Sequence, residues 1–234
     1  MSDVQSHLYS KEFSSALRVK LSSLGIPHPR PFGLTRGGRN TALINLLGKE
    51  GKVLHFGCAD HAPLIQTKLE NGVYFHQLLK EAVGESNLWG YDPNLEGVAE
   101  MRRLGFGQVV ESLEALREES FDTILFPDTL EHLQNPGLVL DEIKQLEFRT
   151  LIVSVPNAYS LSNRFFFGSE VINSDHRTLH SAYSLSKLLA EAGFVLTSLT
   201  FADFWGWSKP LTSFMKLSFP MTREHLIAVF EKAR

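Results

Sequence analysis

The chain of 234 residues contains a single cysteine, Cys58, and so cannot form an internal disulfide or a cysteine-based zinc cluster. It also lacks a run of roughly 18 apolar residues, the length that a membrane-spanning helix requires. Its first residues, MSDVQSHLYSKEF, do not show the basic and then apolar pattern of a secretory signal. We therefore expect a protein of the reducing cytoplasm without a membrane span.

An excess of positive charge is missing as well. The net charge is −3, which argues against a nucleic-acid-binding protein because such proteins normally present a basic face. Hydrophobic residues make up 43% of the chain, enough for a sizeable core, and neither repeats nor low-complexity tracts occur. We expect one domain over residues 51–234, preceded by an N-terminal helical or cap segment over residues 1–50.

From residue 52 onward, short apolar runs alternate with helical patterns, which is typical of a parallel sheet covered by helices. The last two runs have no helical pattern between them, so one of these strands is expected to be antiparallel. The prediction is an α/β, Rossmann-like, mostly parallel sheet with helices on both faces. Its seven expected strands span residues 52–57, 87–92, 107–111, 121–127, 150–156, 194–204 and 225–233.

Helices are expected between these strands. One begins at Asn94, with Leu95, Val98, Met101 and Leu104 on its buried face, and another begins near Pro136. A third is expected over residues 184–192, with Ser184 as its N-cap and Gly193 after its end.

Three segments are longer than this architecture requires, and we interpret them as insertions. Residues 62–86 contain two amphipathic halves joined by Asn71 and Gly72, which predicts two short helices. Residues 157–180 and 205–223 are long connections rich in aromatic residues, and long connections in a compact domain are often functional. The apolar part of the last connection also leaves a dimer surface open, so we expect a monomer or a homodimer.

Ligands of open parallel sheets bind beyond the carboxyl ends of the strands, so the residues there are candidate site residues. The first strand ends in HFGCAD, with one glycine where a phosphate-binding loop carries three, and that glycine lets the backbone approach a ligand. The second strand ends in YDP, and its Asp92 can accept hydrogen bonds from both hydroxyls of a ribose. The third strand ends at Glu111, the fourth runs into FPDTLEH, and the fifth runs into VPNAYS.

These segments resemble the motifs of class I S-adenosylmethionine-dependent methyltransferases, over about residues 50–232. HFGCAD is similar to the first motif, although His55 replaces its acidic residue and only Gly57 remains of its glycines. Four further segments are similar to the later motifs and occur in the family's order: YDPN, FDTILFPDTLEHLQNPGLVLDEI, LIVSVPNA and DHRTLHSAYSLSKLLAEAGF. The form of the first motif and of the insertion after it resembles a bacterial subgroup whose members often act in glycan or other sugar-linked pathways.

The resemblance implies methyl transfer from S-adenosylmethionine to an oxygen or nitrogen of a small molecule, with a sugar or glycan precursor as one candidate acceptor. Asp92 would bind the ribose of the cofactor, and Gly57 would lie close to its methionine moiety. The implied cofactor-binding residues are His55, Phe56, Gly57, Cys58, Ala59, Tyr91, Asp92, Pro93, Glu111, Ser112, Leu113, Pro127, Asp128 and Thr129.

An acceptor hydroxyl would also need a base, for which Asp128, His132 and His176 are the candidate catalytic residues. His132 can equally be a core histidine bonded to the backbone. We expect no metal; the alternative is a divalent ion bound by Asp128, Glu131 and His132, with His176 or His180 added, similar to the set of some RNA and quinone O-methyltransferases.

Three other functions remain open from the residues alone. A methyltransferase acting on RNA or protein would need a basic or aromatic strip. A nicotinamide-dependent oxidoreductase would need the glycine spacing that HFGCAD lacks. A catalytically silent binding protein would share the fold without the reaction.

Overall fold

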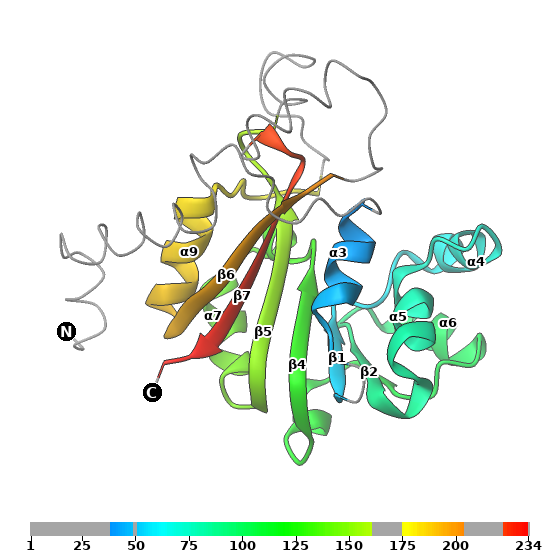
Figure 1. Ribbon diagram of the computed structural model, residues 1–234. Helices are drawn as coiled ribbons and strands as arrows, with labels where there is room; N and C mark the ends of the chain where they lie inside the picture. The colour runs from blue at the N-terminus through cyan, green and yellow to red at the C-terminus, as the bar shows by residue number, and fades with distance from the viewer. Residues whose placement is uncertain (1–37, 49–50, 161–174, 204–221, 234) are drawn as a thin grey trace.

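The computed structural model describes residues 38–48, 51–160, 175–203 and 222–233. Seven strands in these ranges form one sheet, in the order β3-β2-β1-β4-β5-β7-β6 (Figure 1). β7 lies between β5 and β6 and runs antiparallel to both, whereas all other neighbouring strands are parallel. The predicted seven-stranded, mostly parallel sheet is confirmed. The strands are β1 (Val53–Phe56), β2 (Leu88–Tyr91), β3 (Val109–Val110), β4 (Ser120–Pro127), β5 (Glu147–Pro156), β6 (Phe194–Ala202) and β7 (His225–Lys232).

Helices cover both faces of the sheet, because successive side chains of its strands point to opposite sides. On one face, Leu54 and Phe56 of β1 pack in a cluster with buried residues of α7 and α9. On the other, Val53 packs with buried residues of α3 and α5. The helices are α3 (Gly38–Leu46), α4 (Ala62–Glu70), α5 (Phe75–Val83), α6 (Leu95–Arg103), α7 (Pro136–Ile143) and α9 (Ala182–Glu191), with short 3₁₀ turns η1 (Glu85–Asn87), η2 (Leu113–Leu116) and η3 (Leu130–His132).

The insertion over residues 62–86 forms the two predicted helices, α4 and α5. Asn94 caps α6 as expected, since its side chain accepts a hydrogen bond from the amide of Gly97. Leu95, however, is 67% exposed, because the buried face of α6 is set by Val98 and Met101.

The predicted start of α9 is wrong. Its N-cap is Ser181 rather than Ser184, and the two serines form a reciprocal capping box in which each side chain accepts from the other's backbone amide. Ser184 therefore lies inside the first turn, since a capping box needs a partner three residues after the cap. Leu185 and Leu189 are buried on this helix.

Parts of the sequence-based interpretation lie outside the described residues. These are most of the N-terminal segment and most of the aromatic connections over residues 157–180 and 205–223. No helix in the described ranges is long and apolar enough to cross a membrane.

Candidate functional site

The turn after β1 is held against the end of β2 by a row of backbone contacts. The amides of Gly57 and Cys58 donate to the carbonyl oxygen of Tyr91, at 2.8 and 3.2 Å. The next amide, that of Ala59, donates to the Asp92 carboxylate at 2.9 Å. The first motif and the acidic residue after β2 therefore form one structural unit at the carboxyl edge of the sheet.

Asp92 is the centre of this unit. Its second carboxylate oxygen accepts from the amide of Asn94 at 2.9 Å, and the residue is only 8% exposed. Burial raises the pKa of Asp92, while the hydrogen bonds from Asn94 and Ala59 act in the opposite direction. Because a carboxylate has about four lone-pair sites, each oxygen retains one for a ligand hydroxyl.

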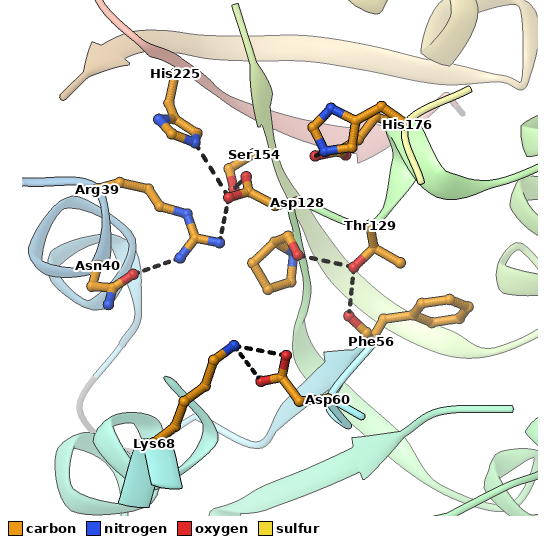
Figure 2. A network of polar contacts seen from close by, with 12 residues as sticks. Arg39, Asn40, Phe56, Asp60, Lys68, Asp128, Thr129, Ser154, His176 and His225 are labelled. Carbon is orange, nitrogen blue, oxygen red and sulfur yellow. Dashed lines mark hydrogen bonds and ion pairs between the residues drawn. The ribbon is translucent and has the colours of Figure 1, made fainter. Parts of the chain in front are cut away.

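Gly57 adopts a left-handed conformation, with φ of 75°. A Cβ atom at this position would lie 2.8 Å from Cγ2 of Thr129 and closer still to its hydroxyl. That hydroxyl donates to the carbonyl oxygen of Pro127 at 2.9 Å (Figure 2). The missing Cβ of Gly57 thus makes room for Thr129 of the loop after β4.

Other predicted cofactor-binding side chains in the first motif point into the core. The ring of Phe56 packs on those of Tyr91 and Phe126, with centroids 4.6 and 4.4 Å away. The thiol of Cys58 lies 3.8 Å from the sulfur of Met101, and burial raises its pKa well above the ordinary value. Phe56 and Cys58 therefore offer a ligand only their backbone.

His55 is also buried, in contact with His76 of α5. Their Nδ1 atoms are 3.0 Å apart and their rings are stacked. Burial is the main cause that lowers both pKa values, that of His76 to about 3. The nearby charges of Arg39 and Lys80 lower the pKa values of His55 and His76, respectively, still further. Both imidazoles are therefore neutral at pH 7, and one Nδ1–H donates to the other.

This pair predicts acid sensitivity. Below about pH 6.5 the unfolded chain binds protons on both histidines while the folded chain does not. Both histidines should therefore reduce stability as the pH falls from 6.5 to 5, and His76, with a pKa of about 3, should remove about 1 kcal/mol per pH unit over this window. Glu131, whose pKa is raised to about 8, changes stability in the opposite direction over this window.

The measurement is the free energy of unfolding in urea at pH 6.5 and 5 for the wild type and for His76→Gln. All other titrating groups are common to both proteins, so the slope with pH should be smaller in His76→Gln by about 1 kcal/mol per pH unit. Equal slopes in the two proteins would mean that His76 takes up its proton in the folded state.

Asp128 directly follows β4, and its carboxylate contacts three side chains from distant parts of the chain (Figure 2). Arg39 of α3 forms an ion pair with it at 2.6 Å, and Nε2 of His225 lies 3.3 Å from the same oxygen. Its other oxygen accepts from the hydroxyl of Ser154 at 2.7 Å. Asp128 also has a positive φ of 43°, unusual for a residue other than glycine.

This network determines what Asp128 can do. Burial by itself would raise its pKa, but the charges of Arg39 and His225 and the hydrogen bonds from His225 and Ser154 together hold the pKa well below its usual range. A carboxylate that is so stabilised is a weak base. Sequence reasoning missed Arg39, Ser154 and His225, because no local pattern connects them with Asp128.

A second pair that sequence reasoning missed is Asp60 with Lys68. The ammonium of Lys68 on α4 lies 2.7 Å from both oxygens of Asp60 (Figure 2). Asp60 directly follows Ala59, so this pair adds one charge of each sign beside the unit centred on Asp92.

The predicted residues on the β2 and β3 side lie at the surface. Pro93, Glu111 and Ser112 are exposed, and Leu113 is half-buried. The hydrogen bond from Arg102 lowers the pKa of Glu111, and Ser112 caps η2 by accepting from the amide of Glu114. The Asp92 amide donates to the carbonyl oxygen of Val110, which places these residues next to Asp92.

Glu131, His132 and His176 come together beyond the end of β4. The rings of His132 and His176 have centroids 4.7 Å apart, and Nε2 of His176 lies 4.0 Å from a carboxylate oxygen of Glu131. Burial and the charge of Asp128 raise the pKa of Glu131 to about 8. Burial and His132 are the main causes that lower the pKa of His176. His180 stays apart: it is buried beside Thr178, with which it shares a hydrogen bond of 3.0 Å.

Comparison with known proteins agrees with this architecture. The model of a family described as a methyltransferase domain matches residues 35–199, which is more than half of the chain. No curated protein shows a significant match to the sequence.

Similar solved structures are methyltransferases at low sequence identity, which shows a common fold. One is a chain of the complex between the Haloferax volcanii Trm112 methyltransferase activator and a methyltransferase; it has 12% identity and a TM-score of 0.58, covering 100% of this chain and 99% of that chain. An S-adenosylmethionine-dependent methyltransferase from Aquifex aeolicus has 15% identity and a TM-score of 0.56, covering 92% and 98%. One from Mesorhizobium loti has 14% identity and a TM-score of 0.52, covering 82% and 96%.

Proposed function

The chain belongs to the methyltransferase-domain family, with S-adenosylmethionine as its methyl donor, and we propose that it methylates an oxygen or nitrogen of a small molecule. The observation that carries the proposal is the unit formed by the turn after β1 and Asp92. It gives a buried carboxylate with free lone pairs at the carboxyl edge of the sheet, where ligands of such folds bind.

The donor is proposed to lie across this edge. Asp92 would accept hydrogen bonds from the ribose hydroxyls, with Tyr91 and Pro93 beside the nucleoside. Glu111, Ser112 and Leu113 would meet the adenine edge. The opposite charges of Asp60 and Lys68 complement the ammonium and carboxylate of the methionine moiety, which supports placing that moiety beyond Gly57.

The acceptor is proposed to lie next to Asp128, His132 and His176. The sulfonium is already electrophilic, so the protein mainly has to align the acceptor and exclude water. Asp128 is suited to anchoring the loop after β4 rather than to taking a proton, since its charge is fully compensated. His176, whose pKa is lowered, is neutral at pH 7 and so able to act as a base. A sugar or glycan precursor as acceptor rests on the resemblance of the first motif alone.

Removal of the Asp92 carboxylate should abolish tight donor binding. Asp92→Ala removes two hydrogen bonds from the ribose and two that order the turn, so the Kd for S-adenosylmethionine should rise at least about 100-fold at roughly 1.5–3 kcal/mol per charged hydrogen bond. Calorimetric titration measures this, with circular dichroism to show that the fold persists.

Glu96→Gln on the exposed face of α6 is the matched control and should bind as the wild type does. A wild-type chain that binds no S-adenosylmethionine would contradict the proposal and favour the silent binding protein. Binding of NADH in its place would favour the oxidoreductase.

A further inference from the structure

Three side chains with metal-ligating atoms converge beside the acceptor region. Glu131 and His132 belong to η3 after β4, and His176 comes from the segment before α9. One ligand atom from each of the three lies within 4.8 Å of the other two. Fold topology, rather than sequence proximity, brings His176 to the other two.

The carboxylate of Glu131 has no hydrogen-bond partner in the part of the chain that the structure describes. Its side chain is 1% exposed, yet neither oxygen has a hydrogen-bond partner there. Arg39, whose charge also acts on Glu131, is engaged by Asp128. A buried carboxyl group, charged or neutral, normally has a hydrogen-bonding or charged partner, since burying its polar atoms without one is costly. The carboxylate of Glu131 is therefore placed to receive a cation.

The backbone holds the three ligands in place. The amides of Arg177 and Thr178 donate to the carbonyl oxygen of Glu131, at 2.8 and 3.3 Å, so the segment that carries His176 is fixed to η3. Nδ1 of His132 lies 3.2 Å from the carbonyl oxygen of Asp175. With a proton on that nitrogen, Nε2 keeps its lone pair for a metal, which is the usual arrangement of a metal-binding histidine.

We propose that Glu131, His132 and His176 bind one divalent transition-metal cation. Two imidazoles and one carboxylate suit Zn²⁺ or Co²⁺ better than Mg²⁺, which prefers oxygen ligands. Asp128 is not a ligand, because its oxygens already bind Arg39, Ser154 and His225. This set differs from the one that the sequence alternative suggested, which began with Asp128.

The three ligand atoms must move closer together when a metal binds. Ligand atoms of a tetrahedral site with bonds of about 2.1 Å are about 3.4 Å apart. Nε2 of His176 and the Glu131 oxygen, at 4.0 Å, must approach by about 0.6 Å, and a pair at the 4.8 Å limit must approach by about 1.4 Å, which side-chain rotations can supply. Three protein ligands leave a position open. Resting on the proposed function, that position would take an acceptor oxygen and lower its pKa, and the metal would then replace His176 as the group that activates the acceptor.

The test is metal binding by the full chain without S-adenosylmethionine, so its result is independent of donor binding. The protein is first treated with a chelator and then titrated with Zn²⁺, Co²⁺ or Mg²⁺ in a calorimeter, and the visible absorption of Co²⁺ is recorded. We expect one Zn²⁺ or Co²⁺ per chain and much weaker binding of Mg²⁺. Glu131→Gln and His176→Ala should each weaken binding at least about tenfold, in line with the cost of disturbing a metal site.

The exposed His61 supplies the control, since His61→Ala should bind metal as the wild type does. Thermal unfolding shows whether each variant is folded. The metal titration of the wild type tests the proposal even if a variant does not fold. The proposal is overturned if the wild type binds neither Zn²⁺ nor Co²⁺, if Mg²⁺ binds more tightly, or if folded Glu131→Gln and His176→Ala both bind like the wild type. None of these results would affect the donor site, which calorimetry with S-adenosylmethionine tests separately.

Discussion

Gly57→Ala is expected to destabilise the protein by about 2–5 kcal/mol, the sum of a left-handed backbone penalty and an overpacking penalty. The backbone at this position has φ of 75°, and the new methyl group would overlap with the side chain of Thr129. Thr129 cannot easily retreat, because its hydroxyl is bonded to the carbonyl oxygen of Pro127. Urea unfolding followed by circular dichroism measures the loss.

Gly72 offers a matched control for this substitution. It also has a positive φ, of 65°, but nothing lies within 4 Å of the position of a Cβ atom there. Gly72→Ala should therefore cost only the backbone part, about 1–2 kcal/mol. Combining Gly57→Ala with Thr129→Ala should restore about 1–3 kcal/mol by removing the overlap. If Gly57→Ala costs no more than Gly72→Ala, the close packing of Gly57 on Thr129 is refuted.

The second large effect is expected from Arg39→Met, which removes the cation from Asp128 and keeps most of the side-chain length. The pair is mostly buried, with the two side chains 12% and 20% exposed, so the carboxylate would be left with His225 and Ser154 alone. Breaking a fully buried pair costs about 3–5 kcal/mol, and we expect about 2–4 here because some solvent reaches both groups. Denaturant unfolding at pH 7 gives the value.

An exposed ion pair provides the comparison. Arg103 pairs with Glu100 on the surface of α6, and Arg103→Met should leave stability unchanged within error. Asp128→Asn added to Arg39→Met should recover part of the loss, since asparagine tolerates the positive φ and carries no charge to compensate. Equal stabilities of Arg39→Met and Arg103→Met would show that Arg39 does not compensate the charge of Asp128.

The sequence was sufficient to predict features that depend on neighbouring residues. The alternation of strands and helices, the antiparallel end of the sheet and the cap at Asn94 follow from local periodicity and turn chemistry. The sequence did not predict which of two serines, Ser181 or Ser184, caps α9, because both can act as N-caps. It also placed Leu95 on the buried face of α6, where packing leaves this residue exposed.

For the site, the sequence alone determined which residues stand at the carboxyl ends of the strands, because strand ends can be read from local patterns. Only the tertiary structure decided what those residues contact. It placed Thr129 against Gly57, Arg39 and His225 on Asp128, and His176 beside Glu131. The partners in each case come from elements far apart in the chain, and no spacing rule connects them, since their distance is set by the order and packing of the sheet.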